Sequence, residues 1–127
     1  MSEPTERFTT GMTTRRSVLG GAYVDGAVAT SSPFTAEFQT LITEGAWGTV
    51  WSRETISKRE RSMMTIALLA ALGHFDELAM HVRATKNTGA TADDIKEALL
   101  HVAIYAGVPA ANHAFKVAEK ALADIER

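Results

Sequence analysis

The chain has 127 residues, a formal net charge of −2 and no cysteine, with 46% hydrophobic and 22% charged residues. These values predict a single globular domain over residues 1–127, with residues 1–10 as a loose terminus. The charge offers no positive field for nucleic acid, and the uncharged run 63–73 is too short to span a bilayer. Because MSEPTERF does not resemble a secretory signal, we expect a cytoplasmic location without nucleic-acid or membrane partners. The missing thiols exclude thiolate and disulfide chemistry.

The first half of the chain predicts two helices and a connector. A basic stretch over Met12–Leu19 is closed by the Gly20-Gly21 pair, which indicates a helix stop. Ser32 followed by Pro33 predicts the start of the second helix, which runs to Gly45. Its apolar face would carry Phe34, Phe38, Leu41 and Ile42. Residues 46–55, AWGTVWSRET, are expected to form a partly helical connector whose large aromatic side chains make a wall.

The second half carries clearer helix signals. Ser57 and Glu60 match a capping box before an apolar helix that ends at Gly73. A helix over Phe75–Asn87 follows, and Thr91 with Asp94 starts the next one, which runs through Tyr105. Pro109 then begins the final helix. Since no strand-like alternation is visible, we predict an all-α fold, a compact helical bundle of five to six helices.

Two of these helices each offer a Glu-His pair beside an apolar stripe. Glu77 and His81 are four residues apart and so share one helix face, next to the stripe of Phe75, Leu78, Ala79 and Val82. On the following helix Glu97, His101 and Tyr105 form a similar row. Bundle metal sites usually place Glu and His three residues apart, and no further inward Glu completes a ligand set, so no metal is predicted. For His81 the alternatives are proton transfer and a structural histidine at the core edge, while packing is preferred for His101 and Tyr105.

Several arginines could bind an anionic ligand, because a guanidinium meets a carboxylate through two parallel hydrogen bonds. The candidates are Arg15, Arg16, Arg53, Arg61 and Arg83. Simple solvation is the alternative for most of them, and a surface ion pair is the alternative for Arg53 and Arg61. The two tryptophans, Trp47 and Trp51, belong to the core by default.

Four segments in order resemble the gamma-carboxymuconolactone decarboxylase family of the protocatechuate pathway. They are GMTTRRSVLGGAYVD, EFQTLITEGAWGTVWSR, RSMMTIALLAALG and ELAMHVRATKNTGATADDIKEALLHVAIYAGVPAAN, and together they cover nearly the whole chain. The resemblance implies the helical fold of alkylhydroperoxidase D-like proteins and a homo-oligomer, trimer or hexamer. In the peroxidase branch a C-x-x-C-x-x-x-H motif carries the chemistry. Here His74 and Glu77 stand at its cysteine positions, so thiol peroxidase activity is excluded.

The activity implied by the resemblance is decarboxylation of a small-molecule lactone carboxylate without a cofactor. The breaking C–C bond releases electrons through the ring double bond to the lactone carbonyl oxygen, so the substrate is its own electron sink. His81 is expected to donate a proton to carbon or a hydrogen bond to the lactone oxygen, with Glu77 orienting it and supporting its protonated form. The expected substrate-binding residues are Arg15, Arg16 and Arg53 for the carboxylates and Trp47 and Trp51 as apolar walls. Tyr105 and Asn112 are expected either to line the site or to fix the helix turn, and for Glu97 the structural role is preferred.

This chain departs from the family pattern at Tyr23, where a histidine is common, and at Ala106, where a cysteine is common. Neither position is therefore expected to be catalytic. Two other interpretations remain: a relative acting on another lactone or keto acid, and a non-catalytic helical module for ligand binding or assembly.

Overall fold

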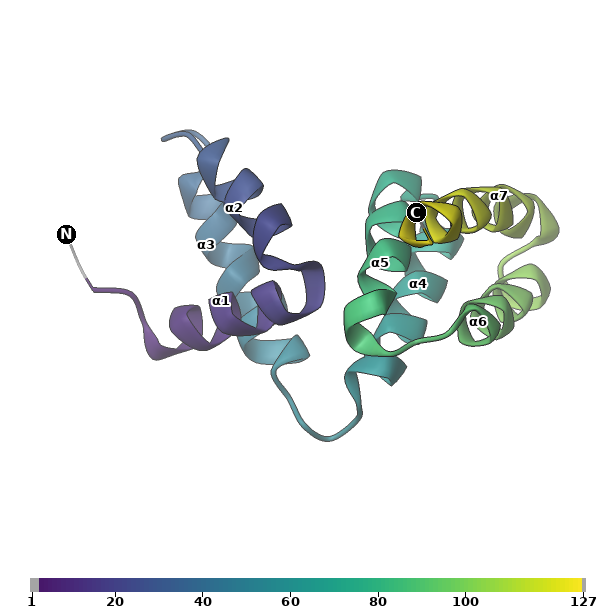
Figure 1. Ribbon diagram of the computed structural model, residues 1–127, viewed down its shortest axis with the longest axis horizontal. Coiled ribbons are helices and arrows are strands. Elements are labelled where there is room, and N and C mark those ends of the chain that lie inside the picture. Colours follow the sequence, from purple (N-terminus) through teal and green to yellow (C-terminus); the bar gives the residue numbers. More distant parts are fainter. Residues whose placement is uncertain (1–2, 127) are drawn as a thin grey trace. The chain divides into compact units, whose positions relative to one another are not determined.

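The computed structural model describes residues 3–126, and within them the fold is all-α, as predicted (Figure 1). The described part of the chain contains seven α-helices, more than the expected five to six. The chain divides into two compact units, one up to Ile56 and one from Ser57, which are described separately. The single domain predicted over residues 1–127 stays a prediction. No helix within residues 3–126 is long and apolar enough to cross a membrane.

The first unit begins earlier in the sequence than predicted. Helix α1 (Glu6–Leu19) starts where the Thr5 side chain accepts a hydrogen bond from the Phe8 N–H at 3.0 Å, so the predicted loose terminus is wrong from Glu6 onward. Residues 1 and 2 of that terminus lie outside the described residues. Gly20 ends α1 at φ 94°, which confirms the predicted stop. Helix α2 (Gly21–Ala29), which was not predicted, begins at the next residue.

The second predicted helix starts later than expected and continues further. The chain makes a turn after Ser32, and α3 (Ala36–Ile42) runs directly into a π-helix, η1 (Thr43–Trp51). The expected partly helical connector is thus helical as far as Trp51. The predicted apolar face is largely exposed: the Phe34 side chain is 95% exposed, and Phe38 and Leu41 are also at the surface.

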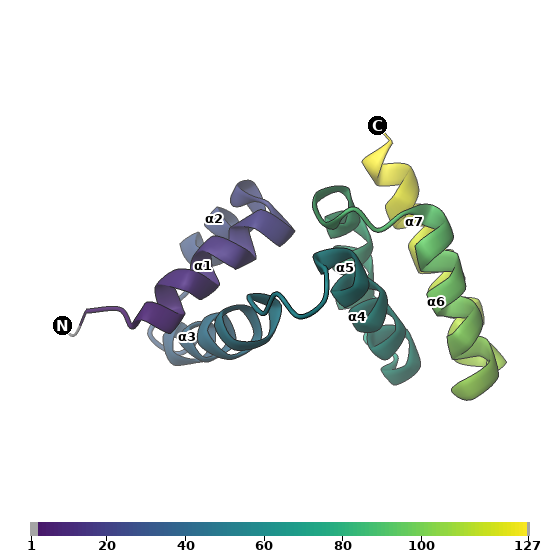
Figure 2. The same cartoon turned by 90° about the horizontal axis from the view of Figure 1, so that it is seen from below.

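Two glycines let α1 lie directly against η1, the two elements seen side by side in Figure 2. A Cβ atom at Gly11 would lie 2.1 Å from the Thr43 carbonyl oxygen, and one at Gly48 would lie 2.3 Å from the Arg7 carbonyl oxygen. Both distances are far inside van der Waals contact, and both neighbours are backbone atoms. The close approach of these two elements therefore requires glycine at both positions.

The second unit follows its sequence signals closely. Helix α4 (Lys58–Leu72) begins at the predicted capping box of Ser57 and Glu60 and ends at Gly73, which is left-handed. Helix α5 (Phe75–Thr88) ends at Gly89, α6 (Ala92–Tyr105) begins at a second capping box, and α7 (Val108–Ile125) has proline in its first turn. The four helices surround a core that includes Ile66, Leu78, Val82, Ile95, Leu99 and Val102. The stripes predicted for α5 and α6 supply most of these residues.

Candidate active-site residues

His81 lies on α5 at the edge of the second unit's core. Its side chain is 7% exposed, and its neighbour Val82 is fully buried. Burial disfavours the charged imidazolium and lowers the pKa of His81 to about 4, although the nearby Glu77 carboxylate acts in the opposite direction. Glu77 thus favours the protonated form of His81, as expected, but desolvation outweighs the charge of Glu77. At neutral pH His81 is a neutral imidazole, which can donate one N–H hydrogen bond and accept another.

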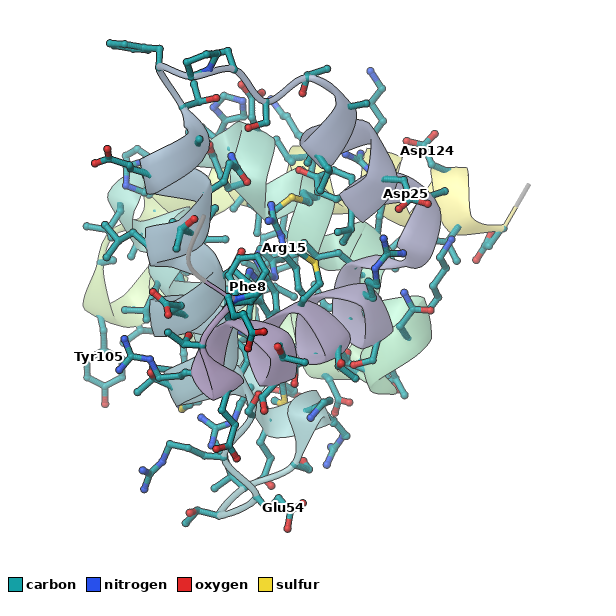
Figure 3. All side chains as sticks on the ribbon, turned by 90° about the vertical axis from the view of Figure 1, so that its left-hand side faces the viewer. Phe8, Arg15, Asp25, Glu54, Tyr105 and Asp124 are labelled. Carbon is teal, nitrogen blue, oxygen red and sulfur yellow. The ribbon has the colours of Figure 1, made fainter. Side chains whose placement is uncertain are left out.

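The corresponding row on α6 faces solvent. Nδ1 of His101 lies 3.3 Å from the backbone carbonyl oxygen of Glu97, and the His101 ring stacks on Tyr105 with centroids 6.1 Å apart. Tyr105 is 85% exposed, and its side chain points away from the protein in Figure 3. In the second unit, then, the Glu-His pair of α5 has a buried imidazole and the pair of α6 does not.

Asn112 lies at the surface of the second unit, in a groove of about 480 Å³ between α6 and α7. Apolar side chains of Ile95, Leu99 and Phe115 line the groove, together with charged groups of Lys116 and Glu119. Sequence reasoning put Asn112 near a helix turn but did not predict this groove, because it is formed between two helices.

Trp47 and Trp51 are both buried in the first unit. Their ring centroids are 5.2 Å apart and the ring planes are tilted by 34°. The Ser52 hydroxyl donates to the Trp47 carbonyl oxygen at 2.6 Å and also lies 2.6 Å from the Thr14 hydroxyl of α1. The tryptophans thus belong to the packing of η1 and α1, and their role as an apolar wall for a substrate stays a prediction.

The three arginines of the first unit have different surroundings. Arg16 is exposed and forms an ion pair with Asp25 of α2. Arg53 is exposed just after η1. Arg15 is only 5% exposed, and burial lowers the pKa of its guanidinium, an effect that Tyr23 partly offsets. An arginine this far from water is costly unless an anion or hydrogen bonds accompany it.

Arg15 is held by neutral groups of the neighbouring helices. Its Nη1 donates to the Gln39 Oε1 atom at 3.1 Å and to the Thr43 hydroxyl at 3.4 Å. Sequence reasoning missed Gln39 and Thr43, because nothing in the local pattern sets them apart from other polar residues of a helix. The three side chains line a cavity of about 180 Å³ inside the first unit.

Comparison with known proteins agrees with the all-α fold. The sequence profile of the Carboxymuconolactone decarboxylase family matches residues 36–120. The 4-carboxymuconolactone decarboxylase of Acinetobacter baylyi is 43% identical over 120 residues, which are 94% of this chain and 90% of the relative. The nitrosuccinic acid decarboxylase of Metarhizium robertsii is 41% identical over 118 residues, 93% of this chain and 82% of the relative. A 4-carboxymuconolactone decarboxylase of Pseudomonas putida is 44% identical over 43 residues, 34% of this chain and 90% of the relative.

The fold and these similarities define a helical decarboxylase, a carboxy-lyase. The chain belongs to the Carboxymuconolactone decarboxylase family. The resemblance found in the sequence motifs is thereby confirmed at the level of the family and of the reaction class.

Proposed function

We propose that this protein decarboxylates gamma-carboxymuconolactone to β-ketoadipate enol-lactone, without a cofactor, in protocatechuate catabolism in the cytoplasm. The similarity to the Acinetobacter enzyme along 94% of the chain supports this substrate. The observation that carries the proposed chemistry is the buried His81, one helical turn from the Glu77 carboxylate.

The substrate itself supplies the electron sink. When the bond between the ring carbon and the carboxylate breaks, its electron pair moves through the ring double bond onto the lactone carbonyl oxygen. Carbon dioxide leaves and a dienolate remains. The dienolate then takes one proton at ring carbon, so that each turnover consumes one proton from solvent. The protein's task is to stabilise the negative charge that develops on the lactone oxygen.

His81 is proposed to donate its N–H hydrogen bond to that oxygen. Because its pKa is about 4, the imidazole is neutral at the start of the reaction and keeps a proton available for donation. We propose that Glu77 orients the ring. Its carboxylate favours positive charge on the imidazole, an effect that becomes useful as negative charge builds up on the substrate. A fixed donor in a water-poor environment stabilises this charge more than a donor in water would.

A second candidate substrate is nitrosuccinate, because the Metarhizium relative is 41% identical over 93% of this chain. In a nitro acid the nitro group would replace the lactone carbonyl as the electron acceptor. Both candidate substrates lose one carboxylate and keep another. The two reactions therefore make the same demand on the protein, and only the acceptor differs.

The experiment is a turnover assay of purified protein on both substrates with a chelator present, following carbon dioxide and product. We expect turnover of the lactone, and a loss of about 10²–10³-fold in kcat for His81→Ala, as for removal of one directed donor. His101→Ala is the matched control, since His101 also follows a Glu by four residues but is exposed. It should stay within about twofold of the parent.

Each other outcome would overturn part of the proposal. Undiminished turnover by a folded His81→Ala protein would refute the role of His81. Turnover of nitrosuccinate alone would replace the proposed substrate. Turnover of neither substrate by folded protein would favour a decarboxylase that acts on another lactone or keto acid, or the non-catalytic binding or assembly module.

We also propose that the protein is a homo-oligomer, a trimer or hexamer. Large apolar side chains are exposed on both units, and such side chains are commonly covered by a partner subunit. They include Phe34, Phe38 and Leu41 in the first unit and Leu68, Leu72, Ile104 and Val108 in the second. Light scattering of the purified protein gives the mass, and a monomer at micromolar concentration would contradict this proposal.

A further inference from the structure

A small cavity in the first unit contains a buried positive charge. Apolar side chains of Phe8, Met12 and Val28 line it, and Arg15, Gln39 and Thr43 supply its polar atoms. Phe8 and Arg15 are labelled in Figure 3, where both belong to α1. The cavity therefore combines an apolar wall with one cation.

The charge of Arg15 has no anionic partner within residues 3–126. Its Nη1 donates only to the neutral Gln39 and Thr43 groups, and its Nε is buried with no hydrogen-bond partner among the described residues. By contrast, three other arginines of the described residues form ion pairs with aspartates: Arg16 with Asp25, Arg59 with Asp94, and Arg83 with Asp124. A buried guanidinium with an unused donor is costly by itself, and a carboxylate ligand would supply both the missing charge and the missing acceptor.

The size of the cavity limits what it can hold. Its volume is about 180 Å³, whereas pockets that enclose a whole drug-sized ligand span about 300–1,000 Å³. The space is large enough for a carboxylate on a short aliphatic arm. The apolar side chains of Phe8, Met12 and Val28 would contact the methylene group of such an arm.

We propose that the Arg15 cavity binds the carboxylate that the substrate keeps and not the one that it loses. This assignment rests on the proposed function for the identity of the substrate. A cation against the departing carboxylate would stabilise it more than the neutral carbon dioxide that it becomes, and so would raise the barrier. Against the retained carboxymethyl group, the same cation binds ground state and transition state alike and anchors the substrate. Gln39 and Thr43 are positioning residues that direct the guanidinium.

The first test measures binding without turnover. Succinate, a dicarboxylate with a short arm, is titrated into the complete protein and followed by NMR or calorimetry. We expect Arg15→Gln to weaken succinate binding about 10–100-fold, as for loss of a charged hydrogen-bonded pair. Arg7→Gln is the matched control, because it makes the same change of charge at an exposed position of the same helix and should leave binding unchanged.

A second variant guards against a folding defect in Arg15→Gln. Ala36→Leu keeps the arginine but fills the cavity from α3, where Ala36 lies at the rim and is exposed. It should also weaken succinate binding, with circular dichroism unchanged. Equal succinate affinity in the parent, Arg15→Gln and Ala36→Leu would overturn the proposal, as would a parent protein that does not bind succinate at millimolar concentration.

The kinetic test separates the retained carboxylate from the leaving one. If Arg15 holds the retained group, Arg15→Gln raises KM about 10–100-fold and leaves kcat nearly unchanged, because uniform binding is lost. If Arg15 faces the leaving carboxylate, kcat changes instead, and the proposal is wrong. Succinate binding that depends on Arg15 without any lactone turnover would refute the proposed function and leave the cavity assignment. Lactone turnover by the parent with an unchanged KM in Arg15→Gln would support the proposed function and refute the assignment of the cavity.

Discussion

The burial of His81 predicts that the protein loses stability in mild acid. Its pKa is about 4 in the folded protein, whereas an exposed histidine in the unfolded chain has its ordinary value of 6.5. Between these two values the unfolded chain binds a proton that the folded protein does not bind. The contribution of His81 is therefore fully present above about pH 6.5 and is lost as the pH falls toward 4.

The size of this effect follows from the shift. One pKa unit corresponds to about 1.4 kcal/mol, so lowering the pKa from 6.5 to about 4 corresponds to about 3 kcal/mol over the whole window. At about pH 4.5 the free energy of unfolding should therefore be about 2.5 kcal/mol lower than at pH 7, because most of the range between the two pKa values lies above pH 4.5. This is a large part of the total stability of a small protein, about 5–15 kcal/mol.

The measurement is urea unfolding of the parent and of His81→Gln at about pH 7 and pH 4.5, at one protein concentration. Between pH 7 and pH 4.5 the free energy of unfolding of the parent should fall by about 2–3 kcal/mol more than that of His81→Gln. His101→Gln, which changes an exposed histidine, should lose as much as the parent. An equal loss in the parent and in His81→Gln, or an NMR titration of His81 centred near its ordinary value, would refute the argument from burial.

Two further predictions concern the packing of each unit. Gly11→Ala should destabilise the protein by about 3 kcal/mol in thermal or urea unfolding, since its Cβ would lie 2.1 Å from the Thr43 carbonyl oxygen. Gly26→Ala is the control: nothing lies within 4 Å of its Cβ position, so it should be neutral or stabilising by about 0.5–1 kcal/mol. Equal effects of the two substitutions would contradict the close contact at Gly11. The pKa of Asp94 lies below its usual range because Arg59 donates two hydrogen bonds to it, each of 2.7 Å. The Asp94 carboxylate therefore stabilises the fold at pH values above its pKa of about 4 in the unfolded chain, and this stabilisation is lost as the pH falls further. The free energy of unfolding of Asp94→Asn, measured against pH, should fall less steeply in acid than that of the parent. Parallel curves for the two proteins would contradict the pairing with Arg59.

The helix boundaries that the sequence predicted well are those with local signals. Ser57 and Thr91 each satisfy backbone N–H groups through their own side chains, and Gly73 takes a left-handed conformation that few other residues adopt. These effects involve residues within one turn of each other. They are therefore readable from a short stretch of sequence, whatever the rest of the chain does.

The features that the sequence did not reveal depend on contacts between elements. Arg15 and Arg16 are neighbours of the same type, yet one is buried against Gln39 and Thr43 while the other pairs with Asp25 at the surface. The periodicity placed His81 on a face beside the core but could not give the depth of burial, which decides the direction of its pKa shift. Helix α2 was missed because the Gly20-Gly21 pair, which does end α1, was not expected to be followed at once by another helix.

The position of the tryptophans allows the two units to be followed by different spectroscopic signals. Both tryptophans of the chain, Trp47 and Trp51, lie in η1 and are buried. Intrinsic tryptophan fluorescence thus reports on the first unit alone, while far-UV circular dichroism also follows the four helices of the second. A single unlabelled sample heated once under both detectors shows whether the two units melt together, as one cooperative structure does, or at different temperatures.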